Sequence, residues 1–343
     1  MSSKRWLLAI VSFAVTIGAS VYIVYTTWPE QRNPAILPLW AHSAAIAIVG
    51  LEVLARALKF KLSALSLRVP LSINTALRVC LGGDFGAAIT PGRSGAEPAR
   101  FLVLSEAGVP PSRNLLLLFL ELLLEMSSLA VVVIALGIYF HKEAGSALGG
   151  VLGVVGVYAA VVLGIGALGV VLSKGDTSGP PPKWAENLRL TGRRWRTVQR
   201  ALERIRSSVI AVRDARLGFL GLAWLASVAH ILLRTMVLPL LVYALGVAAP
   251  LAPLVLWPLA LVYGAVVAPV PGGGGLIEVT FKHFLGDAIP APIFGATLVW
   301  WRFYTFYLYV ILGAFAAGRT VMRALREDQE EAMDDPDPAL RSA

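Results

Sequence analysis

The sequence contains few of the residues that soluble enzymes use for chemistry. Cys80 is its one cysteine, which excludes an internal disulfide and gives no basis for a cysteine metal site. The four histidines are scattered, with no His-x-x-x-His or Glu-x-x-His spacing. The chain also has no Gly-x-Ser-x-Gly elbow and no Gly-Lys-Ser/Thr phosphate loop. We therefore expect no metal, no cofactor and no enzymatic activity.

Charge is scarce as well. Charged residues make up 15% of the chain and apolar residues 57%, and the mean hydropathy is +0.72. Several apolar runs reach the roughly 20 residues that a helix needs to cross a bilayer. The composition therefore predicts an integral membrane protein without room for a separate soluble domain. Its net charge of +9 is concentrated in loops and at helix ends, which suggests anionic lipid surfaces rather than nucleic acid.

Two Pro-Gly-rich breaks interrupt apolar sequence, and each is followed within a few residues by a glutamate. The first occupies 90–97 and the second 269–278. Pro and Gly break helices, and broken backbone at membrane depth is tolerated only where protein or a water-filled cavity surrounds it. Two such breaks in matching places point to a transport-type site at a repeat interface. We interpret the surrounding regions, 70–104 and 251–287, as re-entrant hairpins.

Six other apolar regions read as full spans. They lie at about 6–27, 36–58, 114–138, 146–173, 217–245 and 291–318. With the N-terminus inside, the basic residues concentrate on the cytoplasmic side, as the positive-inside rule requires. Those residues are Lys4, Arg5, Lys59, Lys61, Arg68, Arg113, the stretch 174–216, Arg319, Arg323 and Arg326.

This orientation makes the hairpins enter from opposite sides. The predicted fold is an all-α polytopic membrane protein with six full spans plus two re-entrant hairpins in an inverted repeat. The expected segments are a first half (1–145), the first span of the second half (146–173), a basic amphipathic segment (174–216), the rest of the second half (217–326) and an acidic disordered tail (327–343). The basic segment is either a helix lying on the cytoplasmic leaflet or a plain positive-inside loop.

Charged residues within apolar segments are the candidate site. A charge at the bilayer centre costs a few kcal/mol, so these residues must pair or face water. The candidates for lipid headgroup binding or gating are Arg93, Glu97, Arg100, Gly272, Gly273, Gly275, Glu278 and Arg302. A secondary group of buried charges comprises Arg78, Asp84, Glu121, Glu125, His230 and Arg234. They either lock hairpins against spans or bind a headgroup. Glu52 and Arg56 read as a local pair near a cytoplasmic helix end.

The glycines of the second break have a backbone role. A helix starting near Leu276 would direct its N-terminal N–H groups at an anionic headgroup. The alternative is a close-packed hairpin tip without a ligand.

On these motifs the chain resembles the lysylphosphatidylglycerol synthase membrane-region family. The second motif matches from Pro269 to Glu278, followed by Arg302 in an aromatic setting. The first matches at Pro91, Arg93, Gly95, Glu97 and Arg100. Many relatives carry Glu-Arg-x-x-Asp in the next span, where this chain has Glu121 and Glu125. The resemblance implies eight membrane segments, two of them re-entrant, and lipid translocation between leaflets. Members that make aminoacyl lipids carry an added soluble transferase, which we do not expect here.

The sequence therefore predicts a multi-pass flippase of the bacterial cytoplasmic (inner) membrane with both termini cytoplasmic. Its expected partners are membrane lipids: an anionic or aminoacylated phospholipid, or a lipid-linked precursor. No nucleic acid is expected, and a homo-oligomer is left open. The alternatives are an intramembrane lipid-modifying enzyme, with Glu97, Glu121, Glu125 and Glu278 in acid–base roles, and a non-transporting membrane partner subunit.

Overall fold

The computed structural model describes residues 36–90, 93–143, 145–173, 213–264 and 275–320, together with Gly18, Val21, Tyr22, Tyr25 and Trp195. Apart from those single residues, the predicted first span (6–27) lies outside the described chain, as do Gly272 and Gly273, the tail 327–343 and all of the basic segment before residue 213.

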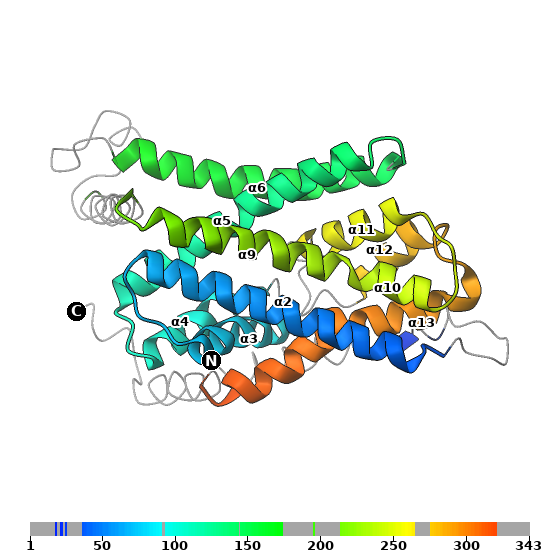
Figure 1. Ribbon diagram of the computed structural model, residues 1–343, viewed down its shortest axis with the longest axis horizontal. Coiled ribbons are helices and arrows are strands. Elements are labelled where there is room, and N and C mark those ends of the chain that lie inside the picture. The colour runs from blue at the N-terminus through cyan, green and yellow to red at the C-terminus, as the bar shows by residue number, and fades with distance from the viewer. Residues whose placement is uncertain are drawn as a thin grey trace, which may run out of the picture.

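Every described element is helical (Figure 1). In chain order they are α2 (Leu39–Ser66), α3 (Ile73–Ile89), α4 (Ala96–Glu106), α5 (Pro111–Tyr139), α6 (Gly145–Ser173), α9 (Leu217–Thr235), α10 (Val237–Ala244), α11 (Leu251–Gly264), α12 (Leu276–Leu285), α13 (Ala291–Arg302) and the π-helical turn η4 (Phe303–Tyr307). The last helix continues beyond η4 to Thr320. The described residues thus confirm the all-α prediction.

Three helices in the described chain are long and apolar enough to cross a membrane. They are Pro111–Tyr139, Leu217–Ala244 and Ala291–Thr320, with mean hydropathies of 2.3, 1.9 and 1.3. Each exceeds the roughly 20 residues that a bilayer requires. They coincide with the predicted spans 114–138, 217–245 and 291–318, so the described chain is that of a membrane protein. The total of six spans stays a prediction.

Helix α2 is longer than its predicted span of 36–58, because it runs on to Ser66. Its buried residues include Glu52, Arg56, Lys59 and Ser63, which recur at helical spacing on one face. Helices α2 and α9 form the most extensive helix pair of the described chain. They run antiparallel, and the Arg216 N–H donates to the Ser66 carbonyl at one end (3.1 Å). In the predicted inverted repeat, these two helices are equivalent.

The first predicted hairpin, 70–104, forms as α3 and α4 packed antiparallel. Their backbones approach closely at Gly86 and Gly95: a Cβ added to Gly86 would lie 2.4 Å from the Gly95 carbonyl oxygen. Thr90 closes the turn, because its hydroxyl donates to the Gly86 carbonyl (2.8 Å) and accepts from the Gly95 N–H (2.7 Å). Glycine is needed at both positions because the backbones touch.

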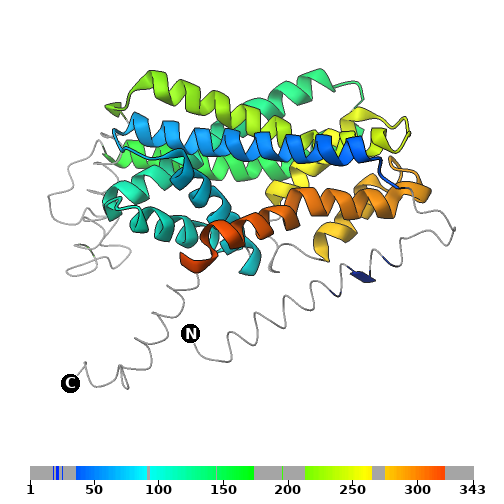
Figure 2. The same cartoon turned by 60° about the horizontal axis from the view of Figure 1, so that its bottom comes forward.

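The second predicted hairpin, 251–287, forms as α11 and α12 on either side of its break. Trp257 of α11 stacks on Phe284 of α12, with ring centroids 3.6 Å apart. Gly275 has a φ of +77° and precedes the first residue of α12, Leu276, which confirms the predicted helix start. In Figure 1 the α3–α4 hairpin lies in the left half of the molecule and the α11–α12 hairpin in the right half, and Figure 2 shows the same separation. How each hairpin enters the membrane stays a prediction.

The apolar core has two parts. The larger part joins α2, α5, α6 and the helices from α9 to α13. The smaller part lies among α2, α3, α4 and the start of α5. The polar face of α2 therefore runs between two apolar regions, where its charges have to find partners on other helices.

Candidate functional site

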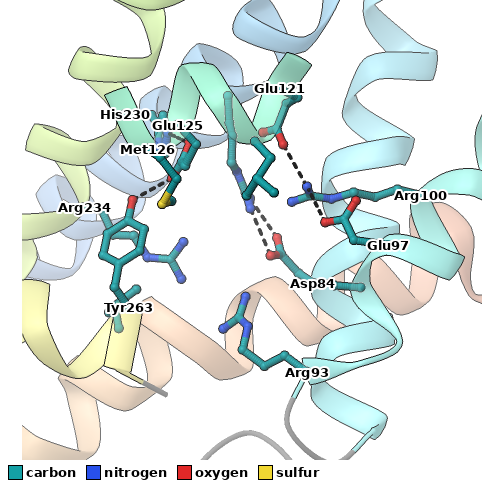
Figure 3. A pocket seen from close by; sticks show the side chains of 14 residues that line it. Asp84, Arg93, Glu97, Arg100, Glu121, Glu125, Met126, His230, Arg234 and Tyr263 are labelled. Atoms are coloured by element: carbon teal, nitrogen blue, oxygen red, sulfur yellow. Dashed lines mark hydrogen bonds and ion pairs between the residues drawn. The ribbon is translucent and has the colours of Figure 1, made fainter. Parts of the chain in front are cut away.

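A cavity of about 240 Å³ lies where α2, α3, α4, α5, α9 and α11 meet (Figure 3). This volume is well above the ~10–15 Å³ that a single water needs. Four arginines and four carboxylates line it, with His230 beside them. The arginines are Arg56, Arg93, Arg100 and Arg234, and the carboxylates are Asp84, Glu97, Glu121 and Glu125. Such a density of charge among apolar helices marks it as the candidate site.

Residues of both predicted hairpins line this cavity. Arg93 and Glu97 follow the first break directly, and both line the cavity. Val262 and Tyr263 line it as well, and they lie at the end of α11, the first arm of the second hairpin. The two hairpins, which lie in opposite halves of Figure 1, thus both contribute residues to one cavity.

Lys59 of α2 holds two carboxylates of α5. Its Nζ lies 2.6 Å from Glu121 Oε1 and donates to Glu125 Oε2. The lysine side chain is fully buried. Glu121 and Glu125 share one helix face, as their spacing of four predicts. Like charges on neighbouring turns would repel, and the ammonium between them offsets this repulsion.

Glu125 also connects α5 to α9 and α11. It accepts a hydrogen bond from the Tyr263 hydroxyl (2.6 Å), and its Oε2 lies 2.8 Å from His230 Nε2. The other ring nitrogen of His230 lies 3.6 Å from Glu52 Oε1. Imidazole, phenol and ammonium groups from three helices therefore surround this one carboxylate.

Glu52 and Arg56 form the predicted local pair, with Arg56 Nε 3.5 Å from Glu52 Oε1, but its predicted position near a helix end is wrong. The side chain of Glu52 is 0% exposed, and that of Arg56 is 5% exposed. Glu52 accepts a hydrogen bond from Tyr309 (2.8 Å), and the Arg56 guanidinium bonds Asp84 through two nitrogens, at 2.9 and 2.8 Å. Because α2 extends to Ser66, these residues lie in its buried middle rather than at its end.

Lys59 follows the predicted end of its span, whereas the structure places it within α2 with its side chain fully buried. A span predicted from hydropathy ends where charged residues begin. Charged residues that pair inside the protein are therefore wrongly placed outside the span. The spacing of Glu52, Arg56 and Lys59 by four and three residues was the available signal, because it places all three on one helix face. No pattern in the sequence indicated that Tyr263 and Tyr309 belong to the site.

Arg100 and Arg93 belong to the first hairpin but differ in their partners. Arg100 Nη1 lies 3.1 Å from Glu97 and 3.0 Å from Glu121. Arg93 has a φ of +57°, and no carboxylate of the described chain lies within ion-pair distance of it. Figure 3 shows its side chain pointing into the cavity.

Arg234 approaches the cavity from α9. Its Nη1 lies 3.6 Å from Glu52 Oε1, and its Nη2 donates to the Thr305 carbonyl (3.1 Å). Its guanidinium also lies over the Tyr309 ring, 5.0 Å from the centroid. Within the described chain its buried Nε makes no hydrogen bond.

Other predicted residues lie elsewhere. Arg78 bonds Glu106 (2.8 Å) and Thr320 (3.1 Å) at the end of the first hairpin. Glu278 and Arg302 form a separate buried pair at 3.0 Å, and neither is among the described residues that line the cavity. Gly275 precedes α12, while Gly272 and Gly273 lie outside the described residues.

The sequence matches the family described as lysylphosphatidylglycerol synthase TM region over residues 9–313. The chain belongs to this family. The matched region includes both breaks, the whole cavity lining and the Glu278–Arg302 pair. No curated protein matches the chain.

Proposed function

We propose that this protein is a flippase of the bacterial inner membrane, which moves a phospholipid or a lipid-linked precursor between leaflets. The headgroup of the transported lipid would occupy the cavity in Figure 3. One observation carries the proposal: a cavity lined by both signs of charge lies among apolar helices, where the first hairpin meets the end of α11.

A headgroup that crosses the hydrocarbon region loses its hydration. Moving an unpaired charge out of water is costly, so a transporter has to replace water with polar groups of its own. The cavity offers four guanidinium groups and four carboxylates. This balance suits a headgroup with a phosphate and a second polar or charged group.

The hairpins supply the proposed gates. In inverted-repeat transporters, broken helices of the two halves meet at a central site, and access alternates between the two sides. Here α3–α4 would close the cavity on one side and α11–α12 on the other. The cytoplasmic location of both termini belongs to the same proposal and rests on the charge bias of the loops.

The test is leaflet exchange of fluorescent lipids in proteoliposomes, read by chemical quenching of the outer leaflet. We expect faster exchange than in empty vesicles, with a loss in Arg100→Gln. Arg319→Gln is the matched control, because Arg319 is exposed on the last helix and is not among the described residues that line the cavity. Exchange no faster than in empty vesicles, across several lipid classes, would overturn the proposal.

The geometry favours binding over intramembrane catalysis. A general acid or base has to reach its substrate. Here Lys59 contacts both Glu121 and Glu125. Arg100 also contacts Glu121, and His230 also contacts Glu125. Covalent turnover of lipid by the purified protein, lost in Glu125→Gln, would favour the lipid-modifying enzyme instead.

A further inference from the structure

Arg93 differs from the other cations in and around the cavity. The nearest carboxylate oxygen lies 2.8 Å from Arg56, 3.0 Å from Arg100 and 3.6 Å from Arg234. Lys59 contacts both Glu121, at 2.6 Å, and Glu125. No such oxygen of the described chain lies within 4.0 Å of Arg93. The carboxylates around the cavity contact other cations, so among the arginines of the described lining Arg93 is the one without a carboxylate contact.

The backbone of Arg93 has a strained conformation, which costs conformational energy. A φ of +57° is a conformation that glycine and asparagine adopt readily, and it costs another L-residue about 1–2 kcal/mol. The turn closed by Thr90 and Gly95 surrounds it. Strain of this kind at a ligand-facing arginine is a reason to look for a binding role. Figure 3 shows the strained residue directing its guanidinium into the cavity.

Arg234 reaches the same cavity from the second predicted half. Within the described chain its acidic contact is Glu52, at 3.6 Å, which also contacts Arg56 and His230. Its Nε has no hydrogen-bond partner within the described residues. Figure 3 shows both guanidinium groups, those of Arg93 and Arg234, facing the interior of the cavity. Two such cations beside a low-dielectric space repel each other unless an anion lies between them.

We propose that Arg93 and Arg234 together bind the phosphate group of the transported lipid. A guanidinium presents paired N–H donors that match phosphate oxygens, and charge-assisted hydrogen bonds of this kind are the strong ones. One arginine comes from each half, so the phosphate would be held at the seam between α3–α4 and α9. This inference rests on the proposed function and specifies the ligand chemistry of its site. Inorganic phosphate could bind to the same two arginines. The experiment therefore distinguishes the phosphate of a lipid from free phosphate.

The experiment measures binding to the purified full-length protein in detergent. The probes are short-chain phosphatidylglycerol, the matching diacylglycerol without phosphate, and inorganic phosphate. We expect Arg93→Asn and Arg234→Gln each to weaken phosphatidylglycerol binding by about tenfold or more. Binding of diacylglycerol should not change. Arg319→Gln removes an exposed guanidinium outside the cavity and should bind like the wild type.

Arg93→Asn also separates binding from folding. Asparagine tolerates a left-handed backbone, so the substitution should not lower the melting temperature. Binding of phosphatidylglycerol alone, or of inorganic phosphate as well, supports the site and identifies the source it accepts. Diacylglycerol binding as tight as that of the phospholipid, or unchanged phospholipid binding in both variants, overturns it.

Leaflet exchange with the same variants distinguishes the two proposals. Arginine-dependent lipid binding without any exchange would overturn the flippase and leave the phosphate site standing. Exchange at the wild-type rate in both variants would overturn the phosphate site and leave the flippase standing.

Discussion

Arg56 of α2 and Asp84 of α3 form a buried ion pair with two parallel contacts. Nη1 lies 2.9 Å from Oδ1, and Nη2 lies 2.8 Å from Oδ2. The pair fixes the first hairpin against α2, and the break of that hairpin carries Arg93. Its geometry therefore determines where one wall of the cavity lies.

Removing one partner of this pair should destabilise the fold. Asp84→Asn leaves the Arg56 guanidinium buried with Glu52, at 3.5 Å, as its one acidic neighbour among the residues that the structure describes. We expect a loss of about 3–5 kcal/mol in the free energy of unfolding, because a buried charge loses its partner. Thermal unfolding in detergent measures it. The double variant Arg56→Met/Asp84→Leu buries no charge at these positions and should recover much of the loss. A double variant less stable than Asp84→Asn would contradict this account.

Lys59 should be needed for the stability of the fold, because its ammonium group lies between two carboxylates. Lys59→Met leaves Glu121 and Glu125 on one face of α5 without the ammonium between them. We expect the free energy of unfolding to fall by about 3–5 kcal/mol, as for other broken buried pairs. Adding Glu125→Gln removes the repulsion and should restore part of the melting temperature. Lys61→Met is the control, since Lys61 is partly exposed and should leave the melting temperature near that of the wild type.

Gly86 should be irreplaceable where the two arms of the first hairpin touch. In Gly86→Ala the new Cβ would lie 2.4 Å from the Gly95 carbonyl oxygen and 2.7 Å from Ala99 Cβ. The arms would have to separate, at a cost of about 1–3 kcal/mol, and the break would shift. Both the melting temperature and leaflet exchange should fall. Gly50→Ala meets nothing within 4 Å and should be neutral or slightly stabilising. A Gly86→Ala protein that melts and transports like the wild type would show that the hairpin adapts.

The positions of the elements could be predicted because their signals are local. Proline, glycine and apolar runs placed the hairpins at 70–104 and 251–287, and the helices begin and end within a few residues of these bounds. The same signals misplaced the end of α2, because Lys59 is polar and its partners lie more than sixty residues away in the sequence. Hydropathy records that a residue is charged but not whether another helix neutralises that charge.

The candidate site could be predicted only in part. Arg93, Glu97 and Arg100 line the cavity together with Glu121, because a hairpin brings its own break to the neighbouring helix α5. Glu278 follows its break in the same way but pairs with Arg302 instead. Which helix each hairpin arm packs against is decided by tertiary packing, and a motif does not contain that information.

The Glu278–Arg302 pair should contribute to the stability of the fold rather than directly to transport. It is buried, with side chains 1% and 6% exposed, and the Arg302 guanidinium lies 4.6 Å from the centroid of the Phe306 ring. It joins α12 to the last helix at the start of the π-helical turn η4. Glu278→Gln should therefore lower the melting temperature, and leaflet exchange should fall in proportion to the folded fraction, because the second hairpin loses an anchor. Arg302→Lys keeps the charge but loses the planar fork, so it should lie between Glu278→Gln and the wild type in both measurements. A Glu278→Gln protein with the full melting temperature and no exchange would instead place this pair in the transport mechanism.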